Sequence, residues 1–343
     1  MLGFGLGPLL WAPLSETVLI TRFFGAFFAS APVTNTGGVL GDLFSATHRG
    51  IAMAGYALAV VGGPTLGPIV SAAVVQYLHL WRWTQYITGI LQSLILLNAI
   101  ISIEETYPPV LLDVNVTELA KKFLIRPMQL LCTPICFLMA LYRLVRLRNP
   151  LRAVPYIFGK LRGWSLLKSM LPFLSITLGC IIGAALNAFN QLAYNKAYQA
   201  AGQRAIPEKR LPPMMLGSVM FACGQFITAW TARPENAPWI APVLGLFLMG
   251  CGFNTIFQAA LNYLVDTFRA YAASAVAANT FLRSIFAAGL PLVIIPLYTD
   301  FGVEITQSVF AGLATLLISV PFVFYYFGRN IRARNKWSRA SVS

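Results

Sequence analysis

Charged residues are scarce in this chain of 343 residues. Asp, Glu, Lys and Arg together make up 10% of it, whereas an ordinary soluble domain carries about 25%. Acidic residues are the rarest, with 11 in all, and none of them lies deep within a long apolar run. This scarcity argues against a water-soluble fold and favours a protein whose solvent is mostly lipid.

Residues that could carry catalysis or bind a metal are also few. The five cysteines lie in apolar runs with no histidine or carboxylate nearby, which favours small buried hydrophobes over metal ligands or disulfides. The two histidines, His48 and His79, lie at opposite ends of one apolar run. Because no histidine or carboxylate sits beside a cysteine and the two histidines lie far apart, an intramembrane enzyme is disfavoured and no cofactor or metal is expected.

Long apolar runs are abundant: 57% of the residues are hydrophobic, and the mean hydropathy is +0.70. A run of about twenty apolar residues, wound as an α-helix, matches the roughly 30 Å hydrocarbon core of a bilayer. Because a spanning helix satisfies its own backbone polar groups, these runs predict an all-α helical bundle in the membrane. The candidate spans cover residues 18–40, 51–75, 83–103, 130–145, 171–192, 214–232, 239–261, 271–298 and 306–328.

The net charge of +14 comes from basic residues in the hinges between the runs and in the tail. Nucleic-acid binding could use such charge, but cytosolic loops of membrane proteins collect Lys and Arg, and this topology is the simpler interpretation. The tail residues are Arg329, Arg332, Arg334, Lys336 and Arg339. We therefore expect a multi-pass protein of the plasma membrane with a cytosolic C-terminus, and with the loop of Asp300 and Glu304 outside.

The hinges also divide the chain. We expect an incomplete N-terminal transmembrane bundle over residues 1–103, a cytosolic linker over 104–129, a C-terminal transmembrane bundle over 130–328 and a basic cytosolic tail over 329–343. Four arginines crowd the end of the span that starts near Leu130: Arg143, Arg146, Arg148 and Arg152. Each Arg near the bilayer centre costs about 2.5–3.5 kcal/mol, so this helix is expected to be short or to direct its arginines to the membrane surface.

Glycine and proline interrupt one span in the run Gly62-Gly63-Pro64-Thr65-Leu66-Gly67-Pro68. Small residues let helices approach closely, and proline frees backbone carbonyls and bends the helix axis. Such a run suits a transporter, although a simple packing kink would have the same composition.

This run looks like the antiporter motif in the fifth helix of the major facilitator superfamily, specifically of its fungal drug:proton antiporters with twelve spans. Other segments that resemble the family are Arg22-Phe23-Phe24 with Ser30-Ala31-Pro32 and Asn35, Asp42, Arg49-Gly50, Trp81-Arg82-Trp83, Glu105-Thr106-Tyr107-Pro108-Pro109, Pro207-Glu208-Lys209-Arg210-Leu211-Pro212-Pro213, Asn262-Tyr263-Leu264-Val265-Asp266, and Ser274-Ala275 with Asn279 and Arg283. The resemblance covers most of the chain. It implies two six-helix bundles that rock about a central cavity, so that each side of the membrane gains access in turn.

The resemblance also implies roles for individual residues. Arg22 would hold a positive charge near the cavity, the alternative being an arginine that caps its span at the interface. The residues of the antiporter motif would shape their helix against the partner bundle: Gly63, Pro64, Gly67 and Pro68. Charged residues at the cytosolic ends would form gate pairs, Asp42 with Arg49, and Glu208 with Arg210 and Asp266. Ordinary solvated loop charges are the alternative for these pairs.

Polar residues inside the apolar runs are candidates for the cargo pocket, because a buried polar group in lipid needs a reason. Asn254, Gln258 and Asn262 recur at a spacing of four, which places them on one face of a helix. Asn187, Asn190 and Gln191 lie together on another span. Hydrogen bonds between helices explain these residues as well as contact with cargo does. The many Phe and Tyr residues suit flat, amphipathic cargo.

The resemblance has a gap. Leu2 to Glu16 look like the end of the family's second helix, and Thr17 then begins the fourth, so the first helix, most of the second and the whole third helix are absent. We attribute the gap to splicing or to an error in the gene structure, which transcript sequencing tests. The fold class expected is therefore a major facilitator bundle of two pseudo-repeated halves, the first of them incomplete.

The function expected from the resemblance is efflux of small amphipathic compounds, such as drugs, toxins or a fungal secondary metabolite, by proton antiport. The expected partners are the small-molecule cargo, protons as the counter-ion and the lipid bilayer, without nucleic acid and with the protein as a monomer. The alternative is a truncated, non-transporting relic of such a carrier. With no acid deep within a span, coupling to protons rests on the resemblance alone.

Overall fold

The computed structural model describes residues 39–40, 43–45, 47–102, 126–131, 133, 135–139, 153–202, 206–268, 271–334 and 338. Every regular element among these residues is a helix. In chain order the elements are α3 (Arg49–Leu78), α4 (Arg82–Ser102), α6 (Arg126–Leu131), the π-helix η4 (Pro155–Leu161), α9 (Leu166–Met170), α10 (Phe173–Ala200), the 3₁₀ turn η5 (Pro207–Arg210), α11 (Pro212–Trp230), α12 (Ile240–Phe268), α13 (Ala272–Asp300), α14 (Gly302–Leu316) and α15 (Ser319–Arg334).

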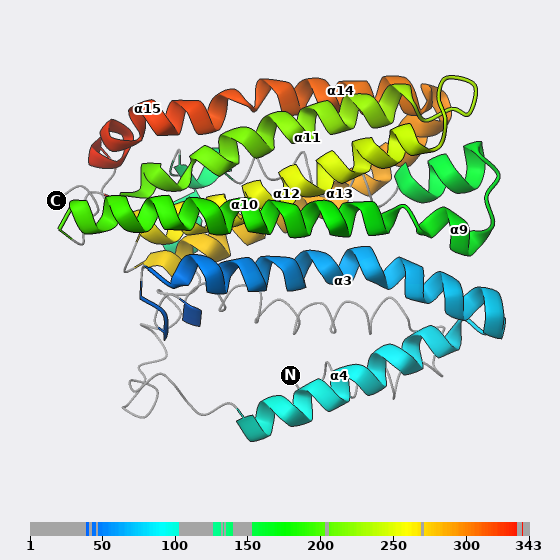
Figure 1. Ribbon diagram of the computed structural model, residues 1–343, viewed down its shortest axis with the longest axis horizontal. Coiled ribbons are helices and arrows are strands. Elements are labelled where there is room, and N and C mark those ends of the chain that lie inside the picture. The colour runs from blue at the N-terminus through cyan, green and yellow to red at the C-terminus, as the bar shows by residue number, and fades with distance from the viewer. Residues whose placement is uncertain are drawn as a thin grey trace.

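The long helices run along the long axis of the molecule (Figure 1). We call the end at which α3 begins and α15 ends the tail end, and the opposite end, where a loop joins α3 to α4, the far end. We also call α3 and α4 the N-terminal helices, and α6 to α15 the C-terminal helices. These names describe position only.

Six described helical segments are long and apolar enough to cross a membrane: Gly50–Leu78, Arg82–Ile101, Leu166–Ala200, Pro207–Trp230, Ile240–Phe268 and Gly302–Arg334. Each overlaps a span expected from the sequence, and α13 covers the expected span 271–298. The expected span 130–145 is described only in part, and nearly all of 18–40 lies outside the described residues. Helix α15 continues without a break past residue 328, so the first basic residues of the expected tail are helical.

Local sequence accounts for several helix ends. Helix α3 stops at His79, which has φ of 54°, and the His79 backbone N–H bonds to Val75 O at 3.1 Å, a left-handed C-terminal cap. Helix α11 opens with Pro212, where a missing N–H costs nothing. Gly302, with φ of 78°, lets the chain reverse between α13 and α14.

Helix α12 forms the centre of the C-terminal helices and packs between α10 and α11, with nearly every residue from Gly245 to Phe268 buried. Close approach depends on small residues. A Cβ atom at Gly250 would overlap the backbone of Ile176 on α10, and one at Gly183 would lie 2.6 Å from Cys251 O on α12. In lipid, where apolar burial does not drive helices together, such close backbone packing stabilises the bundle.

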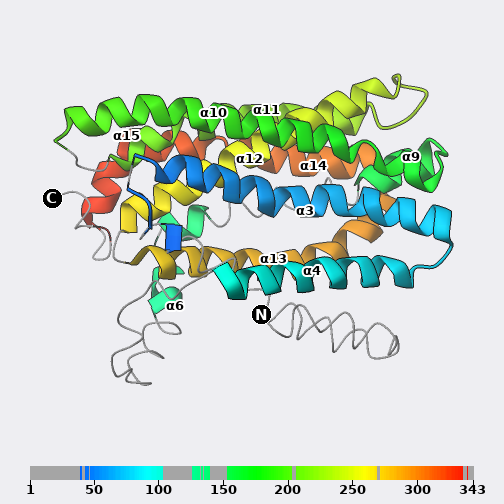
Figure 2. The same cartoon turned by 60° about the horizontal axis from the view of Figure 1, so that its bottom comes forward.

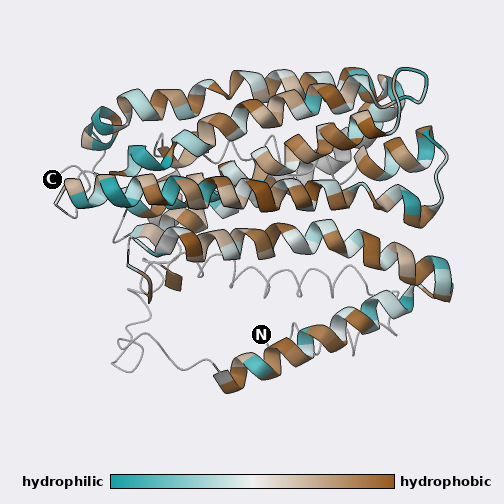
Figure 3. Cartoon of the chain, viewed as in Figure 1, coloured by the Kyte–Doolittle hydropathy of each residue, from teal (hydrophilic) through white to brown (hydrophobic). Residues whose placement is uncertain are grey.

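Hydrophobic residues predominate along the helices, and hydrophilic residues are frequent near the two ends of the bundle (Figure 3). Helix α4 shows this most clearly, because Leu91, Leu94 and Ile95 are each more than half exposed. Exposed tryptophans gather at the far end, at positions 81, 83, 230 and 239. Tryptophan is enriched where a membrane meets water. The exposed apolar belt therefore fits a protein surrounded by lipid.

Helix α3 contacts the C-terminal helices along its whole length (Figure 2). At mid-length, Thr177 Oγ1 on α10 lies 3.0 Å from Thr65 Oγ1 on α3. Near the far end, the backbone N–H of Leu167 donates to Gln76 Oε1 at 2.9 Å. The most polar contact lies at the tail end, and it forms the candidate site.

Candidate functional site

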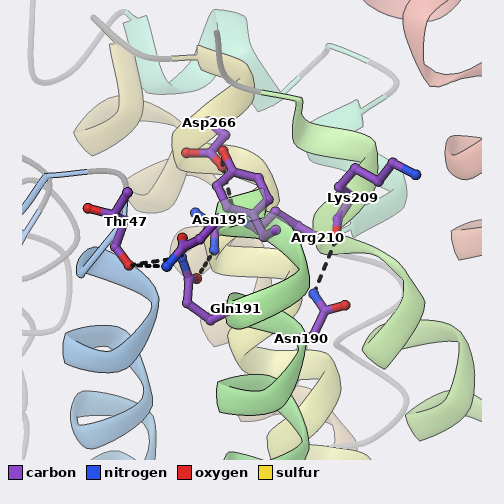
Figure 4. Close-up of polar contacts among 8 residues, drawn as sticks. Thr47, Asn190, Gln191, Asn195, Lys209, Arg210 and Asp266 are labelled. Carbon is purple, nitrogen blue, oxygen red and sulfur yellow. Dashed lines mark hydrogen bonds and ion pairs between the residues drawn. The ribbon is translucent and has the colours of Figure 1, made fainter. Parts of the chain in front are cut away.

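The candidate site is a buried polar cluster at the tail end, where the start of α3 meets α10, η5 and α12 (Figure 4). Its centre is an ion pair between Arg210 of η5 and Asp266 of α12, with Nε and Oδ2 2.9 Å apart. The two side chains are 3% and 2% exposed. A buried pair is stable only when its remaining donors and acceptors are also satisfied.

Side chains of α10 provide partners for these remaining donors and acceptors. The Tyr194 hydroxyl donates to Asp266 Oδ2 at 3.0 Å, and the Arg210 guanidinium carbon lies 3.5 Å from the centre of the Tyr194 ring. A cation over an aromatic face gains about 0.5–2 kcal/mol, more when it is desolvated. Arg210 Nη1 also donates to Gln191 Oε1. Side chains of α10 thus cover the ion pair and shield it from water.

Gln191 joins this pair to the N-terminal helices. While its carbonyl oxygen accepts from Arg210, its amide nitrogen donates to the backbone oxygen of Thr47 at 3.0 Å and to Asn195 Oδ1 at 2.7 Å. Asn195 Nδ2 also contacts the Thr47 backbone oxygen, at 3.4 Å. One amide therefore bridges the ion pair of the C-terminal helices and the residues that lead into α3.

Gly50 provides the close approach that these bonds need. Its backbone oxygen accepts a hydrogen bond from Gln258 Nε2 of α12 at 3.0 Å. A Cβ atom at this position would overlap Gln191 Oε1 and would lie 3.1 Å from Arg210 Nη1. We call the contacts of Thr47 and Gly50 with Gln191, Asn195 and Gln258 the tail-end seam. All its acceptors on the α3 side are backbone oxygens.

Two further contacts hold η5. Asn190 Nδ2 on α10 donates to Lys209 O at 3.1 Å. Glu208, expected from the sequence to act with Arg210 and Asp266, instead has its carboxylate bound by Arg332 of α15, with Nη2 2.6 Å and Nε 3.1 Å from Oε1. Glu208 thus lies on the same turn as Arg210 but faces the last helix.

The amides expected to contact cargo also make bonds between helices. Asn187 Nδ2 donates to Gly183 O within α10 at 3.0 Å and lies 3.4 Å from Thr255 O of α12, and Asn254 Nδ2 donates to Cys180 O of α10 at 2.9 Å. The carbonyl oxygens of three amides on α12 are buried and accept no hydrogen bond from the described part of the chain: Asn254, Gln258 and Asn262. The amide groups of Asn254 and Gln258 donate to other helices, while their carbonyl oxygens accept no bond there.

The antiporter motif lies in α3, which stays helical through Pro64 and Pro68. A Cβ atom at Gly63 or Gly67 would meet no described heavy atom within 4 Å. The contact with α10 at this level comes from Thr65, which is 3% exposed.

Three expected residues cannot be placed fully. Arg22 and Asp42 lie outside the described residues, and Arg49 begins α3 although its side chain lies outside them too. No group of three or more His, Cys, Asp or Glu side chains that could hold a metal occurs among the residues that the structure describes.

Sequence reasoning missed Thr47, Tyr194, Asn195 and Arg332 as members of the tail-end contacts. Thr47 acts through its backbone, so its side chain carries no signal. Tyr194 and Asn195 follow Gln191 by three and four residues, which places them on the same face of α10. That spacing was the available signal.

The apolar exterior and long helices are those of a multi-pass membrane protein, and the polar site between two groups of helices is of the kind found in membrane transporters. Comparison with known protein families identifies the family of the chain. The family model described as Major Facilitator Superfamily matches residues 1–291. The chain belongs to the Major Facilitator Superfamily, and the all-α fold class expected from the sequence is confirmed.

Relatives of this chain are fungal transporters. The chain is similar to "Efflux pump bik6" of Gibberella fujikuroi, with 36% identity over 99% of this chain and 81% of the relative. It is also similar to "Cercosporin MFS transporter CTB4" of Cercospora nicotianae, with 34% identity over 98% of the chain and 76% of the relative. A third relative, "Major facilitator superfamily multidrug transporter FLU1" of Candida albicans, is 32% identical over 98% of the chain and 65% of its own length.

The alignment with the Gibberella pump runs over 396 positions, more than the 343 residues of this chain. Some residues of that relative are therefore aligned with gaps within the chain. This finding agrees with a chain that lacks part of the family's sequence.

Proposed function

We propose that this protein exports small amphipathic compounds across the fungal plasma membrane by alternating access, with protons as the counter-ion. Relatives named as an efflux pump, a cercosporin transporter and a multidrug transporter support export. The proposal includes a monomeric carrier that acts on small molecules rather than on nucleic acid, as a transporter and not an enzyme.

The observation that carries the mechanism is the tail-end seam. Its bonds join side chains of α10 and α12 to the backbone of α3, so a tilt of one group of helices breaks them together. Hydrogen bonds within proteins contribute about 0.5–1.5 kcal/mol each, so the whole seam is worth about 2–4 kcal/mol. An energy of this size suits a gate, because interconverting states differ by a few kcal/mol.

A different contact closes the far end. There, the bond from Leu167 N–H to Gln76 Oε1 joins α9 to α3, and Thr65 and Thr177 touch between the two ends. Opening one end therefore breaks one set of bonds and can leave the other intact, as alternating access requires.

Charge supports a cytosolic tail end. Exposed cations lie there on α10, η5 and α15, at Lys196, Lys209, Arg329 and Arg334, and no exposed acid of the described residues accompanies them. The far end exposes basic residues too, but together with the acids Glu235 and Asp300. Lys and Arg are retained on the cytosolic side of membranes. In this arrangement the tail-end seam is the cytosolic gate, and Arg210 and Asp266 hold its C-terminal half together.

Cargo would lie against the amides of α10 and α12 once the helices separate. Asn187, Gln191, Asn254, Gln258 and Asn262 remain the proposed contacts, and the three free carbonyl oxygens on α12 favour cargo that donates hydrogen bonds. The antiporter motif would shape α3 along the cavity, and Arg22 would carry the charge beside it.

Transport by purified protein tests the proposal. Vesicles that contain the full chain, with an acidic interior, should accumulate the amphipathic dye rhodamine 6G, and a protonophore should abolish the accumulation. Vesicles without protein are the control. Accumulation that persists when the pH gradient is collapsed but the chain is present would exclude proton antiport.

The second candidate, a non-transporting relic, is favoured by the aligned positions of the relative that have no residue here. It predicts a folded, monodisperse protein that accumulates no dye under either condition. Restoring the missing segment from the transcript should then restore accumulation.

A further inference from the structure

The 3₁₀ turn η5 carries two opposite charges that are bound on different sides. Arg210 faces α10 and α12, where it meets Gln191 and Asp266. Glu208, two residues earlier, is bound by Arg332 near the end of α15. The turn has only four residues, so a shift of Glu208 moves the backbone that carries Arg210.

The surrounding structure supports the contact between α15 and Glu208 in several ways. Both Nε and Nη2 of Arg332 reach Glu208 Oε1, and the two side chains are 5% and 15% exposed. Gly328 makes room for the carboxylate, because a Cβ atom there would lie 3.0 Å from Oε1. The buried hydroxyl of Ser338 donates to Arg332 O at 3.0 Å, a further contact at the end of α15.

The far end supplies a comparison within the same chain. Arg233 and Glu304 form an ion pair of the same length, 2.6 Å, but Arg233 is 52% exposed. A pair in water contributes little, whereas a nearly buried arginine strongly constrains its partner. The Arg332 contact is therefore the one able to hold a backbone turn in place.

We propose that Arg332 is a positioning residue for the tail-end gate. Through Glu208 it holds η5 where Arg210 can reach Asp266 and Gln191, and Gln191 in turn binds Thr47 before α3. The end of α15 thereby sets how often the tail end is closed. This inference rests on the proposed function of the seam as a gate.

A conformational measurement on the full chain tests it without any cargo. Spin labels at Ser45→Cys and Lys196→Cys, both exposed and on opposite sides of the seam, report opening of the tail end in lipid nanodiscs. Exposed Cys223, together with Cys132, which lies outside the described residues, is replaced by Ser so that neither takes a label. Arg332→Gln should raise the ratio of open to closed protein by about threefold or more, and Arg332→Lys should lie between it and the parent.

The matched control is Arg334→Gln, an exposed arginine two residues along the same helix. It removes the same charge and should leave the distance distribution unchanged. Equal distributions for Arg332→Gln and Arg334→Gln, in protein of unchanged melting temperature, overturn the proposal. If Gln191→Ala also leaves the distribution unchanged, the seam is not a gate, and the proposed function fails rather than this inference alone.

A double-mutant cycle tests the route through η5. If Arg332 acts through Arg210 and Gln191, its substitution should change the open fraction much less in a Gln191→Ala background than in the parent. Effects that simply add would show that Arg332 acts elsewhere and would overturn its role as a positioning residue. The melting temperature of each variant, followed by tryptophan fluorescence, separates altered gating from unfolding.

Discussion

At the residue scale, the tail-end gate depends on neutral amides placed beside one ion pair. A carboxamide both donates and accepts, so Gln191 can bind Arg210 through its oxygen and Thr47 through its nitrogen at the same time. A carboxylate at this position could only accept, and it would lose the bonds to α3. The charged residues bind within the C-terminal helices, and the amides bind across the seam.

Gly50 is the residue at which the seam is most sensitive. Replacing it with Ala places a Cβ atom against Gln191 Oε1 and Arg210 Nη1. Overpacking of this kind costs about 1–3 kcal/mol, so Gly50→Ala should shift the tail end toward the open state by about fivefold or more. The spin-label pair at Ser45 and Lys196 measures the shift.

Gly55 provides the matched control for this substitution. It lies on the same helix, and a Cβ atom there would meet no described heavy atom within 4 Å. Gly55→Ala should therefore behave as the parent does. A closed population for Gly50→Ala equal to that of Gly55→Ala would show that α3 does not approach α10 as closely as described.

At the scale of the elements, stability and gating reside in different helix pairs. Helices α10 and α12 approach through glycines and small side chains over many turns, whereas α3 packs on them through apolar side chains such as Met53 and Ala57 and through a few polar bonds. A backbone contact without side chains to rearrange is rigid. The C-terminal helices are therefore expected to move as one body, and the seam is the boundary at which movement occurs.

Gly250→Ala tests the rigid contact. The added methyl group would overlap the backbone of Ile176, which cannot move aside as a flexible side chain can. We expect the melting temperature in detergent to fall clearly, by an amount that corresponds to about 1–3 kcal/mol. Gly312→Ala on α14, with no described heavy atom near the new Cβ, should melt like the parent.

A melting temperature for Gly250→Ala equal to that of Gly312→Ala would mean that α10 and α12 are not in backbone contact. The assignment of these helices to one rigid body would then be wrong. Size-exclusion profiles of both variants show whether the loss of stability is accompanied by aggregation.

At the scale of the whole molecule, the two ends of the bundle differ in kind. At the tail end the exposed charges of the described residues are all basic, whereas the far end exposes tryptophans and charges of both signs: Arg82, Lys160, Lys168 and Arg233 with Glu235 and Asp300. A membrane protein inserts with its basic loops in the cytosol. The basic hinges and tail of the sequence, together with this difference, predict a cytosolic tail end.

Epitope accessibility in intact cells checks this orientation. An epitope after Ser343 should be reached by antibody only after the cells are permeabilised, whereas an epitope inserted at Glu235, in the exposed loop before α12, should be reached in intact cells. The opposite pattern would place the tail-end seam outside and remove its role as a cytosolic gate.

The identity of the spans follows from composition, because long apolar runs with almost no charge have no stable place in water. Each of the six described candidate spans overlaps one of the runs, and several of the helices continue beyond their run by more than one turn. The family follows from local motifs around Gly63 and Glu208, since these are short and contiguous in the chain. Both kinds of information lie within single segments of sequence.

What the sequence by itself determined is therefore a multi-pass bundle of the Major Facilitator Superfamily with a set of polar residues inside it. Only the tertiary structure decided which of them meet: Arg210 with Asp266, Glu208 with Arg332, and Gln191 with the backbone before α3. The physical reason is that these contacts join groups from 56 to 144 positions apart. Such pairings depend on how helices cross, and a backbone oxygen such as that of Thr47 leaves no trace in the side chains.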